Sequence, residues 1–136
     1  MKKISFLIAG LLMVAIAYGQ PQKAGVIGVY AITVTLDPDV TMNQYLDATN
    51  EYIPIFEKHV PGVKTFMLHG YRGDHKNEYG LMIYCESAEV YDKYWDEEGK
   101  MTEHLQQIME EQLKEHFQKI SKLGSMAWDF TDWKIL

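Results

Sequence analysis

The segment from Val26 to Leu36 constrains the fold more than any other part of the sequence. It alternates in the manner of a β-strand and is rich in β-branched residues. One face of such a strand carries Val26, Gly28, Tyr30, Ile32, Val34 and Leu36, and the other carries Ile27, Val29, Ala31, Thr33 and Thr35. Because both faces are largely apolar, we expect both to be covered.

A helix is predicted next, from Met42 to His59. Thr41 followed by Gln44 is a capping-box pattern, in which each side chain satisfies a backbone N–H at the start of the helix. Apolar residues then recur at helical spacing, with Thr49 among them, and the Thr49 hydroxyl is expected to bond the carbonyl of Tyr45. Pro54 should bend this helix, and Pro61-Gly62 should end it.

The second half of the chain predicts three strands and another helical region. Two strands, Val63–Tyr71 and Glu78–Cys85, flank a polar connection. Ser87 caps a helical region that Gly99 interrupts and that continues to Leu123, with Gly124 at the C′ position. Its apolar stripe is Met101, Leu105, Ile108, Met109, Leu113, Phe117 and Ile120. A last strand runs from Met126 to Leu136.

This β-α-β-β-α-β order predicts an α+β, ferredoxin-like fold, with one antiparallel sheet and two helices on one face. The helices can cover only one side of the sheet, whereas the first strand is apolar on both sides. A second copy of the chain is the simplest cover for the bare face, so we expect a homodimer.

Residues 1–19 have the pattern of a cleavable signal peptide. Lys2 and Lys3 precede an apolar run that ends at Ala17, and Ala17-Tyr18-Gly19 offers small residues for cleavage before Gln20. A retained anchor is the alternative, but the run is shorter than the roughly 20 residues that a bilayer core requires. We therefore expect a short leader at 20–25, one domain at 26–136, and an exported protein, periplasmic or secreted.

The charge of the chain narrows its partners. Asp and Glu number 19 against 13 Lys and Arg, for a formal net charge of −6, and losing Lys2 and Lys3 makes the chain more acidic still. Such a surface disfavours nucleic acid and anionic membranes, which bind clustered Lys and Arg. Cys85 is the only cysteine, so no intramolecular disulfide forms, and its apolar strand indicates a buried thiol.

Two stretches resemble the dimeric α/β-barrel superfamily, which includes antibiotic-biosynthesis-type and haem-degrading monooxygenases. They are the helix-to-strand passage from Tyr52 to Val63, and Tyr94-Trp95 followed by Met101 and His104. The resemblance implies a dimer whose two sheets form a barrel, with a small-molecule pocket between each sheet and its helices. Haem-degrading members use an Asn on the first strand, a Trp, and a His on the second helix as axial ligand. The resemblance thus implies that Trp95 and His104 correspond to that Trp and that axial His. The first strand, Val26–Leu36, contains no Asn.

The candidate site residues come from this pocket. For a cofactor-independent monooxygenase acting on an aromatic or quinol substrate, the candidate catalytic residues are Asn50, His69 and Trp95, with His69 as a general base if its imidazole points inward. For binding alone, the candidate ligand contacts are Tyr45, Asn50, Tyr52, Met67, His69, Trp95, His104 and His116. Each polar group has a structural alternative, because most buried polar groups are satisfied by protein neighbours.

No cofactor is expected in the leading hypothesis, which is an exported homodimer that binds a small apolar or aromatic molecule. The alternatives are the monooxygenase, a haem protein with His104 as its ligand, and a module that binds no ligand. The acidic runs Asp96–Glu98 and Glu110-Glu111 lack the spaced oxygen ligands of a calcium loop, and we expect them to be exposed helix faces.

Overall fold

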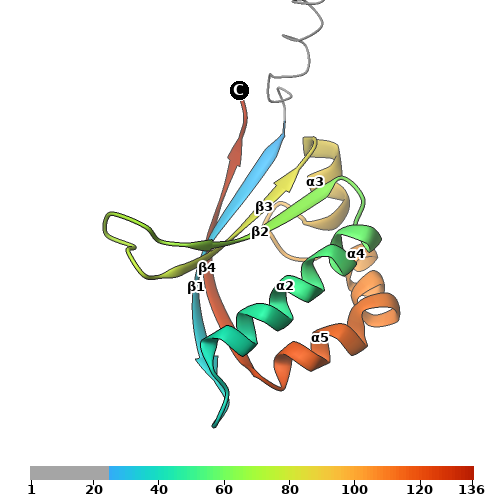
Figure 1. Ribbon diagram of the computed structural model, residues 1–136. Helices are drawn as coiled ribbons and strands as arrows, with labels where there is room; N and C mark the ends of the chain where they lie inside the picture. The colour runs from blue at the N-terminus through green and yellow to red at the C-terminus, as the bar shows by residue number, and fades with distance from the viewer. Residues whose placement is uncertain (1–24) are drawn as a thin grey trace, which may run out of the picture.

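The computed structural model of this protein describes residues 25–136 and has the predicted ferredoxin-like architecture (Figure 1). The described elements are β1 (Val26–Leu36), α2 (Met42–His59), β2 (Val63–His69), β3 (Tyr79–Cys85), α3 (Ala88–Tyr94), α4 (Glu103–Ile108), the π-helical segment η1 (Met109–Leu113), α5 (Lys114–Ser121) and β4 (Gly124–Lys134). The strands form one sheet in the order β2-β3-β1-β4, with every neighbouring pair antiparallel. The helices lie on one side of this sheet, as expected for the fold (Figure 1).

The predicted signal peptide at 1–19 and most of the leader at 20–25 lie outside the described residues. Among the residues that are described, no helix combines the length and the apolar character needed to cross a membrane.

The first helix begins where its capping box predicts. The backbone N–H of Gln44 donates to the Thr41 hydroxyl at 3.3 Å, and the backbone N–H of Thr41 donates to Gln44 Oε1 at 2.8 Å. Each side chain thereby satisfies a donor that the first turn of a helix leaves without a partner. Pro54 lies inside α2, and Val60 is its C-cap.

The second helical region is interrupted at Gly99, as predicted: α3 precedes the interruption, and α4, η1 and α5 follow it without a break. α3 ends at Tyr94, and Asp96–Glu98 lie in a turn closed by the backbone N–H of Gly99 on the carbonyl of Asp96. These acids are exposed, but they are not on a helix face as expected. Met101 forms an isolated bridge with Trp95 and stays exposed, so it is not part of a helical stripe.

The predicted apolar stripe of the last helix is buried only in part, and the helix contains the π-helical segment η1. Leu105, Leu113 and Ile120 are buried as predicted, whereas Phe117 is 50% exposed. The helix ends at Ser121, and Gly124 is the first residue of β4 rather than a helix C′ residue.

The main core lies between the sheet and the helices at the end of the sheet nearest α3. Its buried members are Val26, Val60, Val63, Cys85, Tyr94, Trp95 and Leu105. Cys85 is fully buried there, which confirms the prediction for the thiol.

The opposite face of the sheet is not covered by any described part of the chain. By the strand register, Val29, Met82 and Phe66 lie side by side on this face. Phe66 is 47% exposed, and Val29 and Leu68 are exposed as well. The expectation that both faces of β1 are covered is therefore met on one side only within a single chain.

The strands next to β1 differ in length. β4 pairs with β1 along its full length, from Val26 to Leu36, whereas β3 pairs with it only from Val26 to Ile32. β2 ends at His69 and β3 begins at Tyr79, so both strands are shorter at the hairpin than predicted. The hairpin instead closes on Gly70, whose N–H donates to the carbonyl of Glu78 at 2.8 Å. Beyond Ile32, β1 keeps a free edge on the β3 side.

Replacement of Gly124 by Ala should destabilise the fold, because a Cβ there would lie 2.5 Å from the backbone carbonyl oxygen of Thr35. The strand pair β1–β4 would have to shift, at a cost of about 1–3 kcal/mol in the free energy of unfolding. Urea denaturation of Gly124→Ala checks this, with the exposed neighbour Ser125→Ala as the control. An unchanged midpoint for Gly124→Ala would contradict the expected clash.

Candidate functional site

The three predicted catalytic residues do not meet in one place. Asn50 is exposed on α2, so its amide has access to solvent and needs no buried partner. His69 is exposed at the end of β2, where its ring lies 5.0 Å from the ring of Tyr79. Trp95 is only 6% exposed and packs in the same core as Val63. Val63 begins β2, and His69 ends it roughly 20 Å away at the rise per residue of a strand.

The predicted ligand contacts Tyr45 and Tyr52 are engaged within the protein. Tyr45 is buried, and its carbonyl accepts a hydrogen bond from the Thr49 hydroxyl at 2.9 Å, as predicted. The Tyr52 hydroxyl donates to the sulfur of Met109 at 3.6 Å, and burial raises the pKa of Tyr52 to about 12. Tyr52 therefore keeps its proton at neutral pH and joins α2 to η1.

The predicted histidines of the second helical region do not form a metal or haem site. His104 is exposed, and its ring stacks on Tyr94 with centroids 5.7 Å apart. An axial haem ligand would have to point into an apolar slot, so this position does not fit that role. His116 and the predicted contact Met67 are half-buried. Within residues 25–136, no group of three or more metal-ligating side chains is brought together.

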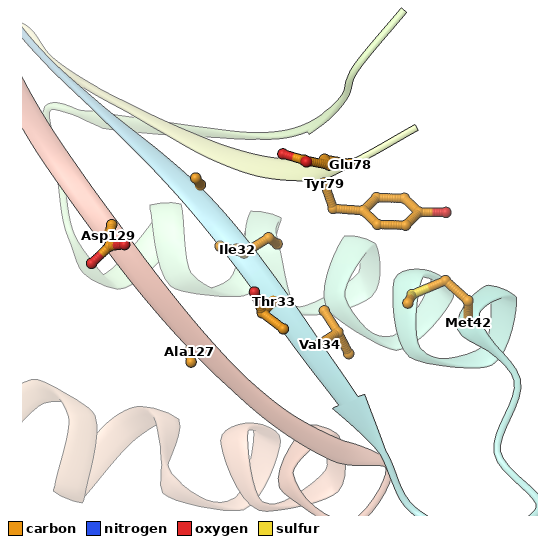
Figure 2. A pocket seen from close by; sticks show the side chains of 9 residues that line it. Ile32, Thr33, Val34, Met42, Glu78, Tyr79, Ala127 and Asp129 are labelled. Carbon is orange, nitrogen blue, oxygen red and sulfur yellow. The ribbon is translucent and has the colours of Figure 1, made fainter. Parts of the chain in front are cut away.

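A groove of about 490 Å³ lies beside the free edge of β1 (Figure 2). Figure 2 shows the side chains of Tyr79, Met42 and Val34 projecting into the space where β1 continues beyond β3. The lining residues are Ala31, Ile32, Thr33, Val34, Met42, Glu78, Tyr79, Ala127 and Asp129. The volume is in the range of small-molecule sites, and the surface of the groove is divided about equally between apolar and polar atoms.

The charges of this groove have one sign. Glu78 and Asp129 contribute carboxylates, and the lining contains no Lys, Arg or His. Just outside it, His75 Nδ1 lies 2.6 Å from Glu78 Oε2, and this hydrogen bond raises the pKa of His75. Within the lining itself, an anionic molecule would meet two carboxylates and no cationic side chain, so the groove suits a neutral or cationic molecule.

A second polar feature lies between the sheet and α3. The Tyr91 hydroxyl donates to Asp132 Oδ2, while Asp132 Oδ1 is buried and accepts no hydrogen bond from the described residues. Burial, with the negative charge of Asp132 as a further cause, raises the pKa values of Tyr30 and Cys85 to about 12. The pKa of Tyr91 is also raised, by burial first and then by its hydrogen bond to Asp132.

The cluster of Tyr30, Cys85, Tyr91 and Asp132 is tightly packed. A Cβ added at Gly28 would lie 2.8 Å from Asp132 Oδ1 and 3.0 Å from the ring of Tyr30. The ring of Tyr91 stacks on Trp95, with ring centroids 5.5 Å apart. We therefore take the groove, which has space for a molecule, as the candidate functional site.

Sequence reasoning did not identify most residues of this groove. Met42 and Tyr79 flank it because β3 pairs with β1 only as far as Ile32, where Tyr79 is its partner, and this extent cannot be read from the sequence of either strand. His69 was predicted, and through its contact with Tyr79 it lies beside the groove rather than in its lining.

Comparison with known proteins identifies no family for this chain. No protein-family model matches the sequence, and no curated protein matches it significantly. The similar solved structures include SnoaB, a cofactor-independent oxygenase from Streptomyces nogalater (13% identity, 79% of this chain and 91% of that chain, TM-score 0.47). They also include a dimeric ferredoxin-like protein of unknown function from Bacteroides fragilis (10% identity, 82% and 96%, TM-score 0.47).

A third similar structure is a putative antibiotic biosynthesis monooxygenase from Bacteroides thetaiotaomicron (15% identity, 83% of this chain and 90% of that chain, TM-score 0.43). These are the kinds of protein that the sequence resemblance named. At such identities and TM-scores, the similarity gives no information about the chemistry of this chain.

Removing the Tyr91 hydroxyl should weaken the fold. In Tyr91→Phe, the partly buried Asp132 carboxylate loses the hydroxyl that donates to its Oδ2, and we expect a loss of about 1–3 kcal/mol in the free energy of unfolding. Chemical denaturation measures it, with Tyr71→Phe as the matched control because Tyr71 is 78% exposed. Equal stability of the two variants would show that this hydrogen bond contributes nothing.

Proposed function

We propose that this protein is an exported homodimer that binds a small, largely apolar molecule, neutral or cationic, in the groove beside β1. The observation that carries the proposal is the groove itself. It combines a volume of about 490 Å³, an apolar lining from Ile32, Val34 and Met42, and the Tyr79 ring. Sites for small molecules combine apolar and aromatic walls with polar groups that orient the ligand, and here Thr33, Glu78 and Asp129 are the polar lining residues.

The homodimer is supported by the uncovered face of the sheet. Val29, Phe66 and Leu68 are exposed together there, with Met82 half-buried beside them. An exposed apolar surface of this kind marks an interaction site in a soluble domain. A second copy offers the same apolar surface, and a two-fold arrangement pairs that surface with itself.

The chemistry proposed is binding rather than catalysis. A monooxygenase without a cofactor would need Asn50, His69 and Trp95, or equivalent groups, around one substrate. Asn50 and His69 are exposed on different elements, and Trp95 is in the core. The carboxylates of Glu78 and Asp129 are the only charged groups among the residues that line the groove.

Tyr79 should contribute directly to binding. We expect Tyr79→Ala to weaken binding of N-phenyl-1-naphthylamine, a neutral apolar fluorescent probe, by about tenfold, because the aromatic wall is lost. A fluorescence titration measures the dissociation constant, and Tyr71→Ala, outside the groove on the same hairpin, is the control. If both variants bind like the wild type, the probe does not use this groove.

Export gives a separate prediction. When the full-length chain is expressed with a bacterial secretion system, we expect the exported product to begin at Gln20, because Ala17 and Gly19 are the small residues that a signal peptidase recognises. N-terminal sequencing of the periplasmic or secreted fraction measures this. An intact N-terminus found only in the membrane fraction would indicate a retained anchor instead.

A further inference from the structure

The lining of the groove comes from both faces of the sheet. Successive side chains of a strand point to opposite faces. Ile32 and Val34 therefore point to the helix side, while Ala31 and Thr33 point to the uncovered side. Across the β1–β4 pairing, Ala127 lies opposite Thr33 and Asp129 opposite Ala31, so both share the uncovered side. The groove thus passes around the free edge of β1 from one side of the sheet to the other.

On the helix side, the groove has walls supplied by this chain. Met42 at the start of α2 and Tyr79 at the start of β3 border it there (Figure 2). On the uncovered side, its lining residues Ala31, Thr33, Ala127 and Asp129 are all exposed. No described residue stands above them, so a molecule bound there would keep one side in water.

The open side of the groove is continuous with the apolar surface proposed for the dimer. Ala31 pairs with Gly80, and Gly80 pairs with Leu68 in the next strand. Gly80 has no side chain, so nothing separates Ala31 from Leu68 on this face. Packed sheets lie about 10 Å apart. A second copy that covers Val29 and Leu68 at that distance would also cover Ala31 and the mouth of the groove.

We propose that the second copy supplies the missing wall of the groove, so that ligand binding and dimer formation are coupled. This rests on the proposed function, because it takes both the homodimer and the groove as given. A molecule that contacts both copies binds the dimer more tightly than the monomer. By linkage, it must strengthen the dimer by the corresponding factor.

The test compares two phenylalanines of similar exposure on different sides of the molecule. Phe66, 47% exposed, lies on the uncovered face and does not line the groove, whereas Phe117, 50% exposed, lies on α5. A buried, unpaired carboxylate is costly, so Phe66→Glu should separate the copies, while Phe117→Glu should leave them together. Sedimentation velocity gives the oligomeric state, circular dichroism the fold, and fluorescence titration the affinity for N-phenyl-1-naphthylamine.

We expect the wild type and Phe117→Glu to be dimers that bind the probe, and Phe66→Glu to be a folded monomer that binds it at least about tenfold more weakly, a loss of about 1.4 kcal/mol. Saturating probe should also lower the dissociation constant of the wild-type dimer. A folded monomeric Phe66→Glu with wild-type affinity would overturn the coupling and leave the groove as a binding site. A wild-type dimer that binds no probe would overturn both the coupling and the assignment of the groove as a binding site.

If Phe66→Glu does not fold, dilution of the wild type tests the same coupling between dimer formation and probe binding. The affinity for the probe must then fall over the concentration range in which sedimentation shows the dimer dissociating. An affinity that stays constant through that range, or a wild type that binds the probe while remaining monomeric, would overturn the proposal.

Discussion

Pairing of the central strand β1 on both of its edges is the interaction on which the rest of the structure depends. β3 and β4 both bond to it, and its buried side supports the helices through Val26, Tyr30 and Ile32. Because the side-chain period of a strand is two, burying these residues places Ile27 and Val29 on the opposite face. The fold thereby creates a second apolar surface that a single chain leaves exposed. The proposed dimer would bury this surface.

The unequal lengths of the partner strands locate the candidate site. β4 follows β1 to Leu36, but β3 pairs only as far as Ile32, so the end of β1 is a half-paired strand. An unpaired strand edge presents backbone donors and acceptors and has no neighbouring side chains to fill the space beside it. Tyr79 and Met42 border this space from two elements that are far apart in sequence.

The interior beneath α3 shows why aromatic and polar residues alone do not define a binding site. Tyr30, Tyr91 and Asp132 have the chemical character of a ligand pocket, yet they are packed against one another over Gly28. Their proximity has an electrostatic consequence, since burial and the Asp132 carboxylate keep both tyrosines protonated well above neutral pH. The cluster stabilises the end of the sheet, and the open groove is left as the place for a small molecule.

The sequence alone determined the order of elements, the capping box at Thr41, the buried Cys85 and the two apolar faces of β1, because each follows from local bonding or from a strand or helix period. Only the tertiary structure decided where β2 ends and β3 begins, that Phe117 stays half exposed, and that Asn50, His69 and Trp95 are separate. Those outcomes depend on register and packing between distant segments. The groove belongs to this second class, because it exists only where three strands of different extent and the start of α2 meet.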